Sequence, residues 1–191
     1  MGAWVERQIF LSYRREDSAA DTGRLSDWLS RELGSDTEIF MDVDDIPSGI
    51  DFAKYLRNKI QQSDAFLAVI GPNWLDARDE EGSRRLDDPN DFVRIEIGVA
   101  LERDIPVIPI LLNGTRMPRA DQLPPELQKL TLRNAVDVRH RSFHADVAPM
   151  IGDLKKLPNS TPRFELPVPL AIAFIAFIAW GLITLLVLGR H

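Results

Sequence analysis

QIFLSYRREDSAADTGRLSDWLSRELG, residues 8–34, sets the pattern from which the fold can be predicted. Its first part, QIFLSY (residues 8–13), is a short apolar run that is typical of a buried strand. Asp17 or Ser18 is expected to cap the helix that follows, because short polar side chains accept hydrogen bonds from the first backbone N–H groups. Helical spacing of apolar residues then continues to Gly34, which is typical of a helix end. The stretch therefore predicts one strand followed by one helix.

The same alternation continues along the chain. Further strands are expected at residues 38–41, 64–70, 106–112 and 135–138, and further helices at 52–60, 92–104 and 143–157. Asp91 is expected to cap the second of these helices. The charged stretch at residues 76–91 predicts a solvated surface loop or insertion. Short apolar strands alternating with helices predict an α/β fold, a flavodoxin-like doubly wound sheet of five parallel strands.

Composition limits the classes of function. The chain has 191 residues, of which 45% are hydrophobic, enough for one packed body plus an appended segment. Its formal net charge of -6 and its pI near 5.1 do not fit a protein that binds duplex nucleic acid, so no nucleic-acid partner is expected. It contains no cysteine, which excludes thiol chemistry and cysteine-bound metals, and only three histidines, so no metal site is expected.

The C-terminal part of the sequence predicts a membrane anchor. Residues 168–188 read VPLAIAFIAFIAWGLITLLVL without a charge, and as a helix they would span about 31 Å. Residues 158–167 form a proline-rich linker, so the expected division is a domain at 1–157, this linker and a transmembrane helix at 168–188. Because no apolar signal segment is present near residue 1, the expected topology is a single-pass, tail-anchored membrane protein with a cytoplasmic domain.

Candidate binding residues follow the expected strands, because doubly wound sheets bind ligands at the carboxyl ends of their strands. Arg14 and Arg15 follow the first strand, where their guanidinium groups could meet a pyrophosphate. Pairing of either arginine with Glu16 or Asp17 at the surface remains an equal alternative.

Glu96 is a candidate of another kind. Its neighbours Ile95 and Ile97 are apolar, and burial of a carboxylate costs several kcal/mol unless the group is paired or neutral. Two interpretations stay open from the residues alone. Glu96 either pairs with Arg94 or another basic group at the surface, or it lies at a ligand cleft.

Three stretches together resemble a known family. IFLSYRREDS (residues 9–18), FMDVDDIPSGIDF (residues 40–52) and the aromatic-x-x-x-Glu of Phe92 to Glu96 look like successive boxes of a Toll/interleukin-1 receptor (TIR) domain of the bacterial kind. The resemblance covers residues 7 to about 157. It implies a self-associating domain that cleaves the nicotinamide–ribose bond of NAD+, with NAD+ as the substrate and without a cofactor or metal.

The resemblance also implies roles for single residues. Glu96 would be the catalytic carboxylate, and Phe92 would take the place of the tryptophan often found four residues before it. Substrate-binding residues would be Tyr13, Arg14 and Arg15 of the first box, Asp44 and Ile46 of the second, and Phe92. Trp28 and Trp74 are expected to be core or surface-cap residues. A linear and a cyclic ADP-ribose product are both compatible with these residues.

Other functional classes fit the sequence less well. A signalling adaptor would keep the TIR fold without catalysis and act through TIR–TIR contacts at the membrane. A response-regulator receiver would need acidic residues after the first strand and an aspartate ending the third, where this chain has Ser12, Tyr13 and Gly71. A dinucleotide or P-loop enzyme would need a glycine-rich first loop, which SYRRED is not. The expected setting is an NAD+-cleaving enzyme in bacterial defence or stress signalling, with a sensor or TIR partner protein as its activator.

Overall fold

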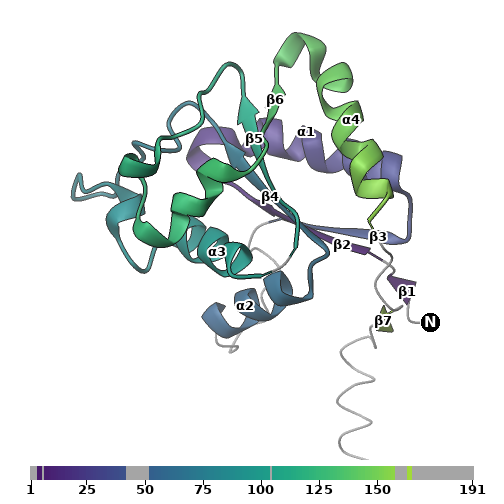
Figure 1. Ribbon diagram of the computed structural model, residues 1–191, viewed down its shortest axis with the longest axis horizontal. Helices are drawn as coiled ribbons and strands as arrows, with labels where there is room; N and C mark the ends of the chain where they lie inside the picture. The colour runs from purple at the N-terminus through teal and green to yellow at the C-terminus, as the bar shows by residue number, and fades with distance from the viewer. Residues whose placement is uncertain (1–3, 6, 42–51, 104, 158–162, 165–191) are drawn as a thin grey trace, which may run out of the picture.

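The five expected strands form one parallel sheet (Figure 1). The structure is a computed structural model that describes residues 4–5, 7–41, 52–103, 105–157 and 163–164. The strand order is β3-β2-β4-β5-β6, and every neighbouring pair is parallel. The strands are β2 (Arg7–Ser12), β3 (Thr37–Met41), β4 (Ala65–Ile70), β5 (Val107–Leu112) and β6 (Val136–Val138). This order is that of a flavodoxin-like doubly wound sheet, so the expected fold class is confirmed.

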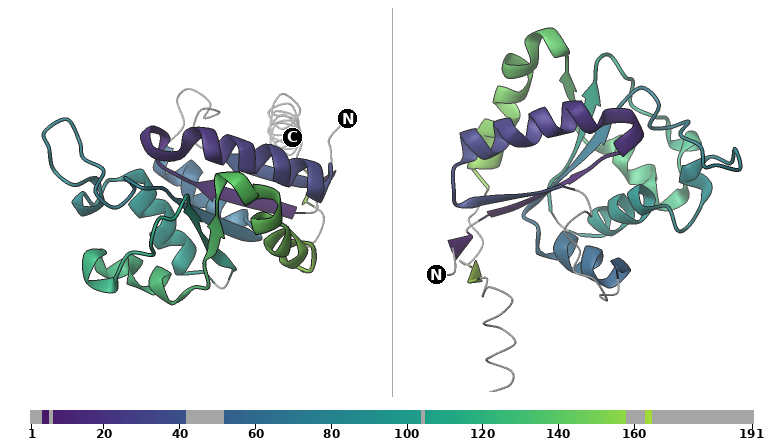
Figure 2. Two further views of the ribbon diagram at one scale, coloured as in Figure 1. Left: turned by 90° about the horizontal axis from the view of Figure 1, so that it is seen from above. Right: turned by 180° about the vertical axis from the view of Figure 1, so that it is seen from behind.

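In the part of the chain that the structure describes, four α-helices cover the sheet: α1 (Arg15–Leu33), α2 (Phe52–Gln62), α3 (Phe92–Leu101) and α4 (Phe143–Lys155). Figures 1 and 2 show α1 and α4 on one face and α2 and α3 on the other. Successive strand side chains point to opposite faces, so Phe10 of β2 packs in the cluster of α2 and α3, whereas Ile9 and Leu11 pack with α1 and α4. The sheet is therefore buried on both faces, which explains why β4 and β5 are apolar throughout.

Short elements complete the described part. The 3₁₀ turns are η2 (Arg85–Asp87), η3 (Ala120–Gln122), η4 (Pro125–Leu132) and η5 (His140–Ser142). β1 (Trp4–Val5) pairs antiparallel with β7 (Arg163–Phe164). Residues within the expected linker thus form a two-residue strand, which an apolar–polar pattern cannot predict because backbone hydrogen bonds alone define it.

One local expectation was wrong. Helix α1 begins at Arg15 with Arg14 at its cap position, and no side chain caps this start. The Asp17 carboxylate instead accepts a hydrogen bond from the Asn73 backbone N–H at 2.8 Å, and the Ser18 hydroxyl donates to the Arg14 carbonyl at 3.3 Å. The charged segment 76–91 is mostly an exposed loop, as expected, although Leu86 within it is fully buried. Trp74 lies in the core and Trp28 packs at the core's margin, as expected.

The predicted transmembrane helix, residues 168–188, lies outside the described residues, as does most of the linker at 158–167. Within the described part of the chain, no helix is both long and apolar enough to cross a bilayer.

Candidate active site

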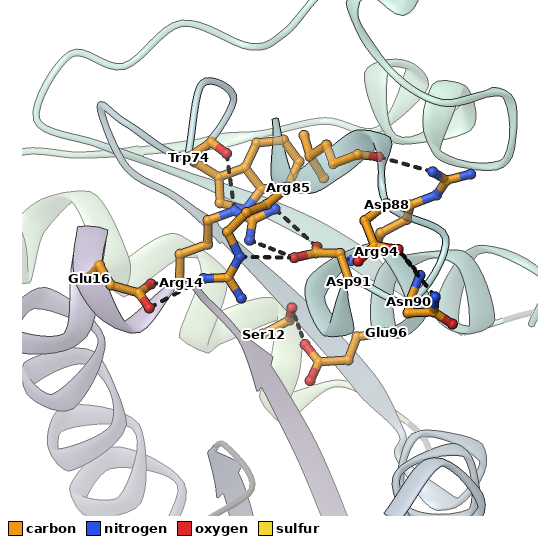
Figure 3. Close-up of polar contacts among 11 residues, drawn as sticks. Ser12, Arg14, Glu16, Trp74, Arg85, Asp88, Asn90, Asp91, Arg94 and Glu96 are labelled. Carbon is orange, nitrogen blue, oxygen red and sulfur yellow. Dashed lines mark hydrogen bonds and ion pairs between the residues drawn. The ribbon is translucent and has the colours of Figure 1, made fainter. Parts of the chain in front are cut away.

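The centre of the candidate site is a contact between β2 and α3. Ser12 is the last residue of β2, and its side chain lies on the same face of the sheet as Phe10, the face that α3 covers. Its hydroxyl donates a hydrogen bond of 2.5 Å to Oε2 of Glu96 on α3 (Figure 3). Ser12 is 2% exposed and Glu96 5% exposed. The arrangement places a buried, hydrogen-bonded carboxylate at the carboxyl edge of the sheet.

Helix α3 starts at a buried cap. The Asp91 carboxylate accepts a hydrogen bond from the backbone N–H of Arg94 at 3.0 Å, so the expected cap is confirmed. This bond satisfies one of the backbone donors that a helix start leaves open. The cap fixes the first turn of the helix that carries Glu96.

Arg14 occupies the space between this cap and β2. Its guanidinium donates to both Asp91 oxygens, at 2.9 and 3.0 Å, and its Nε donates to the Trp74 carbonyl at 3.1 Å (Figure 3). Its side chain is 1% exposed. Arg14 is thus committed to protein groups, and its partner is neither Glu16 nor Asp17, the two that were expected as alternatives.

Arg85 of η2 extends this cluster towards solvent. Its Nε lies 3.3 Å from Oδ2 of Asp91, and its Nη1 lies 3.2 Å from the carboxylate of Glu16. Glu16 is largely exposed, whereas Asp91 is not. Asp91 is therefore held by two arginines and one helix N–H.

Arg94, the surface partner considered above for Glu96, forms an ion pair with Glu126. It donates from Nε to Oε1 of Glu126 at 2.7 Å and from Nη1 to two backbone carbonyls. The backbone N–H of Glu126, and then the Arg94 guanidinium, hold the pKa of the Glu126 carboxyl below its ordinary value. Arg94 is thus directed towards Glu126 and the backbone carbonyls of Leu86 and Asp87.

The other predicted site residues differ in exposure and in the face of the sheet on which they lie. Phe92 is 46% exposed and stands four residues before Glu96, so both project from one side of α3. Arg15 is exposed at the start of α1. Tyr13 is half-buried and packs against the core on the α1 and α4 face, opposite to Glu96. Asp44 and Ile46 lie outside the described residues.

Sequence reasoning did not select Ser12 as a site residue. The available signal was period-2 alternation, which places a hydroxyl on the Phe10 face one position before the arginine pair. Nor did it join Arg14 to Asp91, because 77 positions separate them in the chain. Within the described residues, no group of three or more His, Asp or Glu side chains is arranged to hold a metal ion.

The fold and site together define an α/β domain of flavodoxin-like topology with its candidate site at the carboxyl ends of the strands. The chain belongs to the TIR domain family, whose profile matches residues 9–150.

Known proteins agree with this assignment. The chain is 28% identical over 132 residues to the "NAD(+) hydrolase sarm1" of Drosophila melanogaster, an alignment of 69% of this chain but only 9% of that protein's length. The TIR domains of the activated Roq1 resistosome superpose with a TM-score of 0.54 at 16% identity, over 78% of this chain and 98% of theirs. At that identity the superposition shows the shared fold alone.

Proposed function

We propose that this protein is an NAD+ glycohydrolase in which Glu96 is the catalytic carboxylate. The observation that carries the proposal is the Ser12–Glu96 hydrogen bond, which fixes a buried carboxylate one helical turn from the exposed ring of Phe92. The name of the fruit-fly relative supports the same reaction. The alignment covers 9% of that protein, so its name supports the activity but does not assign it to this chain.

The reaction breaks the bond between the ribose C1′ and the nicotinamide nitrogen, whose electron pair leaves with nicotinamide. Positive charge develops on the ribose ring, as in other glycosidic cleavages. A carboxylate held in a water-poor site stabilises that charge more strongly than one in bulk water. Water then adds to C1′ and releases a proton, which gives ADP-ribose. Attack by a nucleophile of the same molecule instead gives a cyclic isomer.

The remaining substrate contacts are assigned from position. Phe92 presents an aromatic face to nicotinamide beside Glu96. Arg15 is exposed beyond the end of β2 and is the better placed of the two arginines for the pyrophosphate, because Arg14 is buried against Asp91. Tyr13, Asp44 and Ile46 remain proposed substrate contacts on the strength of the family resemblance alone. No cofactor or metal is proposed.

We further propose that residues 168–188 anchor the protein in a membrane, with the TIR domain in the cytoplasm. The support is the uncharged apolar composition of this segment, which is long enough to cross a bilayer as a helix. Confinement in the membrane plane raises the effective concentration of the domains, so self-association there would activate them. A sensor or TIR partner in bacterial defence would supply the trigger. Alkaline extraction of membranes should leave the full chain in the pellet, whereas a chain ending at residue 167 should be released.

Nicotinamide release tests the activity directly. The full chain is crowded at high density on lipid vesicles with NAD+, beside a Glu96→Ala variant, and the products are separated by chromatography. Release by the wild type that disappears in the variant supports the proposal, and the second product distinguishes ADP-ribose from its cyclic isomer. A folded, crowded wild type that releases no nicotinamide would favour the TIR signalling adaptor instead.

A further inference from the structure

We infer that Arg14 and Asp91 form a positioning device for Glu96, and that Arg14 does not bind the substrate pyrophosphate. The inference rests on the proposed function, because it explains how the catalytic carboxylate is held. It assigns to Arg14 a role different from the one that the family resemblance implies.

Arg14 and Asp91 form a buried ion pair with two parallel hydrogen bonds. Both side chains are almost fully buried, with exposures of 1% for Arg14 and 2% for Asp91. Two parallel N–H···O bonds of 2.9 and 3.0 Å join the planar guanidinium to both carboxylate oxygens. This two-bond geometry fixes orientation as well as distance. The third bond, from Nε to the Trp74 carbonyl at 3.1 Å, holds the guanidinium plane from its other edge.

The Arg14–Asp91 ion pair and the Ser12–Glu96 hydrogen bond both connect the end of β2 to the start of α3. Arg14 lies two residues after Ser12, which is about 7 Å of extended chain. Asp91 lies five residues before Glu96, which is about 7.5 Å along a helix. The matched lengths allow both contacts to form between the end of β2 and the first turns of α3. A shift of α3 along or around its axis would therefore break both contacts together.

Electrostatics keeps Arg14 in this position. Removal of Arg14 from Asp91 to contact a substrate would leave a buried carboxylate without its bidentate partner, which is costly. Arg85 approaches the same carboxylate at 3.3 Å but is shared with Glu16. The negative charge of Asp91 therefore retains Arg14 at the base of α3.

Positioning and simple stabilisation predict different results in a paired substitution. Asp91→Ser leaves the buried Arg14 guanidinium without its carboxylate partner, and Arg14→Met leaves Asp91 with Arg85, which also pairs with Glu16. Each single variant should therefore lower the melting temperature. Serine still caps the helix, so the cap survives in Asp91→Ser. The double variant removes both charges and should recover most of the lost stability. Arg14→Lys keeps the charge but loses the two-bond geometry, and provides a second test if the double variant folds poorly.

The test is nicotinamide release by the full chain on vesicles, with kcat normalised to the folded fraction from circular dichroism. The double variant and Arg14→Lys should both keep kcat reduced by about tenfold or more, the loss of one charge-assisted geometry, with the KM for NAD+ changed less than twofold. Recovery of kcat together with the melting temperature would overturn the inference. A raised KM at unchanged kcat would return Arg14 to pyrophosphate binding.

Glu126→Gln is the matched control. It removes an ion pair between α3 and η4, Arg94–Glu126 at 2.7 Å, without touching β2. It should leave kcat unchanged.

A readout without catalysis separates this inference from the proposed function. The carboxyl carbon of Glu96, observed by ¹³C NMR and assigned with Glu96→Gln, should change its chemical shift in the double variant and in Arg14→Lys but not in Glu126→Gln. An unchanged chemical shift in the first two variants would contradict the proposed effect of the Arg14–Asp91 pair on the position of Glu96. A wild type that is inactive but shows these shifts would disprove the proposed activity while supporting the positioning.

Discussion

The hydroxyl of Ser12 and the carboxylate of Glu96 lie 2.5 Å apart, although 84 positions separate the two residues in the chain. A bond of this length from a hydroxyl to a carboxylate is at the short end for charge-assisted hydrogen bonds. It connects the end of a central strand to the helix on one face of the sheet. The carboxylate is thereby oriented before any substrate arrives.

Ser12→Ala should therefore reduce kcat more than it changes KM. Loss of one hydrogen bond to a charged group corresponds to a decrease in kcat of about 10- to 100-fold. Steady-state nicotinamide release at several NAD+ concentrations measures both constants. Ser12→Thr retains the hydroxyl and should keep more activity than the alanine variant. Full activity in Ser12→Ala would show that the bond does not orient a catalytic group.

Phe92 provides a test of substrate stacking. Its ring is 46% exposed on the same side of α3 as Glu96. Phe92→Ala should raise the KM for NAD+ by about 2- to 10-fold, the range expected from one aromatic contact. Phe92→Trp preserves an aromatic face and should bind NAD+ at least as well as the wild type. Equal KM values for all three proteins would place the nicotinamide elsewhere.

Gly71, the residue after β4, is required by a close approach from α1. A Cβ atom at this position would lie 2.1 Å from Oδ2 of Asp17, whose Oδ1 accepts from the Asn73 backbone N–H. Gly71→Ala should displace that carboxylate and lower the free energy of unfolding by about 1–3 kcal/mol. In an Asp17→Ala background the same substitution should cost little. A double-mutant cycle from denaturant unfolding measures the coupling, and additive effects would argue against the steric account.

Asp146 makes stability depend on pH in the acid range. Hydrogen bonds from the Arg139 guanidinium, from the Ser142 hydroxyl and from the Arg139 backbone N–H hold its pKa well below the ordinary value of 3.8. The unfolded chain binds this proton first, so the stabilisation is complete above about pH 4 and declines as the pH falls further. Asp146→Asn should melt at a lower temperature than the wild type at pH 7. The gap should narrow below about pH 4, and a gap that stays constant down to pH 2.5 would contradict the assignment.

Local patterns were sufficient for most of the fold. Each strand of the parallel sheet is a short apolar run bounded by turn residues, so β2, β4 and β5 could be placed to within about two residues. The cap at Asp91 was also predictable, because its carboxylate bonds a backbone N–H only three residues away. The start of α1 was not predictable, since Asp17 has the right chemistry for a cap but its carboxylate accepts a hydrogen bond from the Asn73 backbone N–H.

The site was predictable only in part. Glu96 and Phe92 could be selected because they share one helix at a recognisable spacing. The partners of Ser12 and Arg14 depend on which helix covers which face of the sheet, and a single sequence does not show that. Arg14 was predicted to meet a pyrophosphate or to pair at the surface, because arginines seldom lie buried without a partner, and its partner comes from a distant helix cap.

The central claim is that Glu96 performs the chemistry. The most direct measurement is kcat for nicotinamide release by the crowded full chain and by Glu96→Gln, which keeps the size of the side chain and a hydrogen-bonding oxygen for Ser12. The account predicts a loss of about 100-fold or more in kcat, with the melting temperature within a few degrees of the wild type. A folded Glu96→Gln variant that turns over NAD+ at the wild-type rate would contradict it.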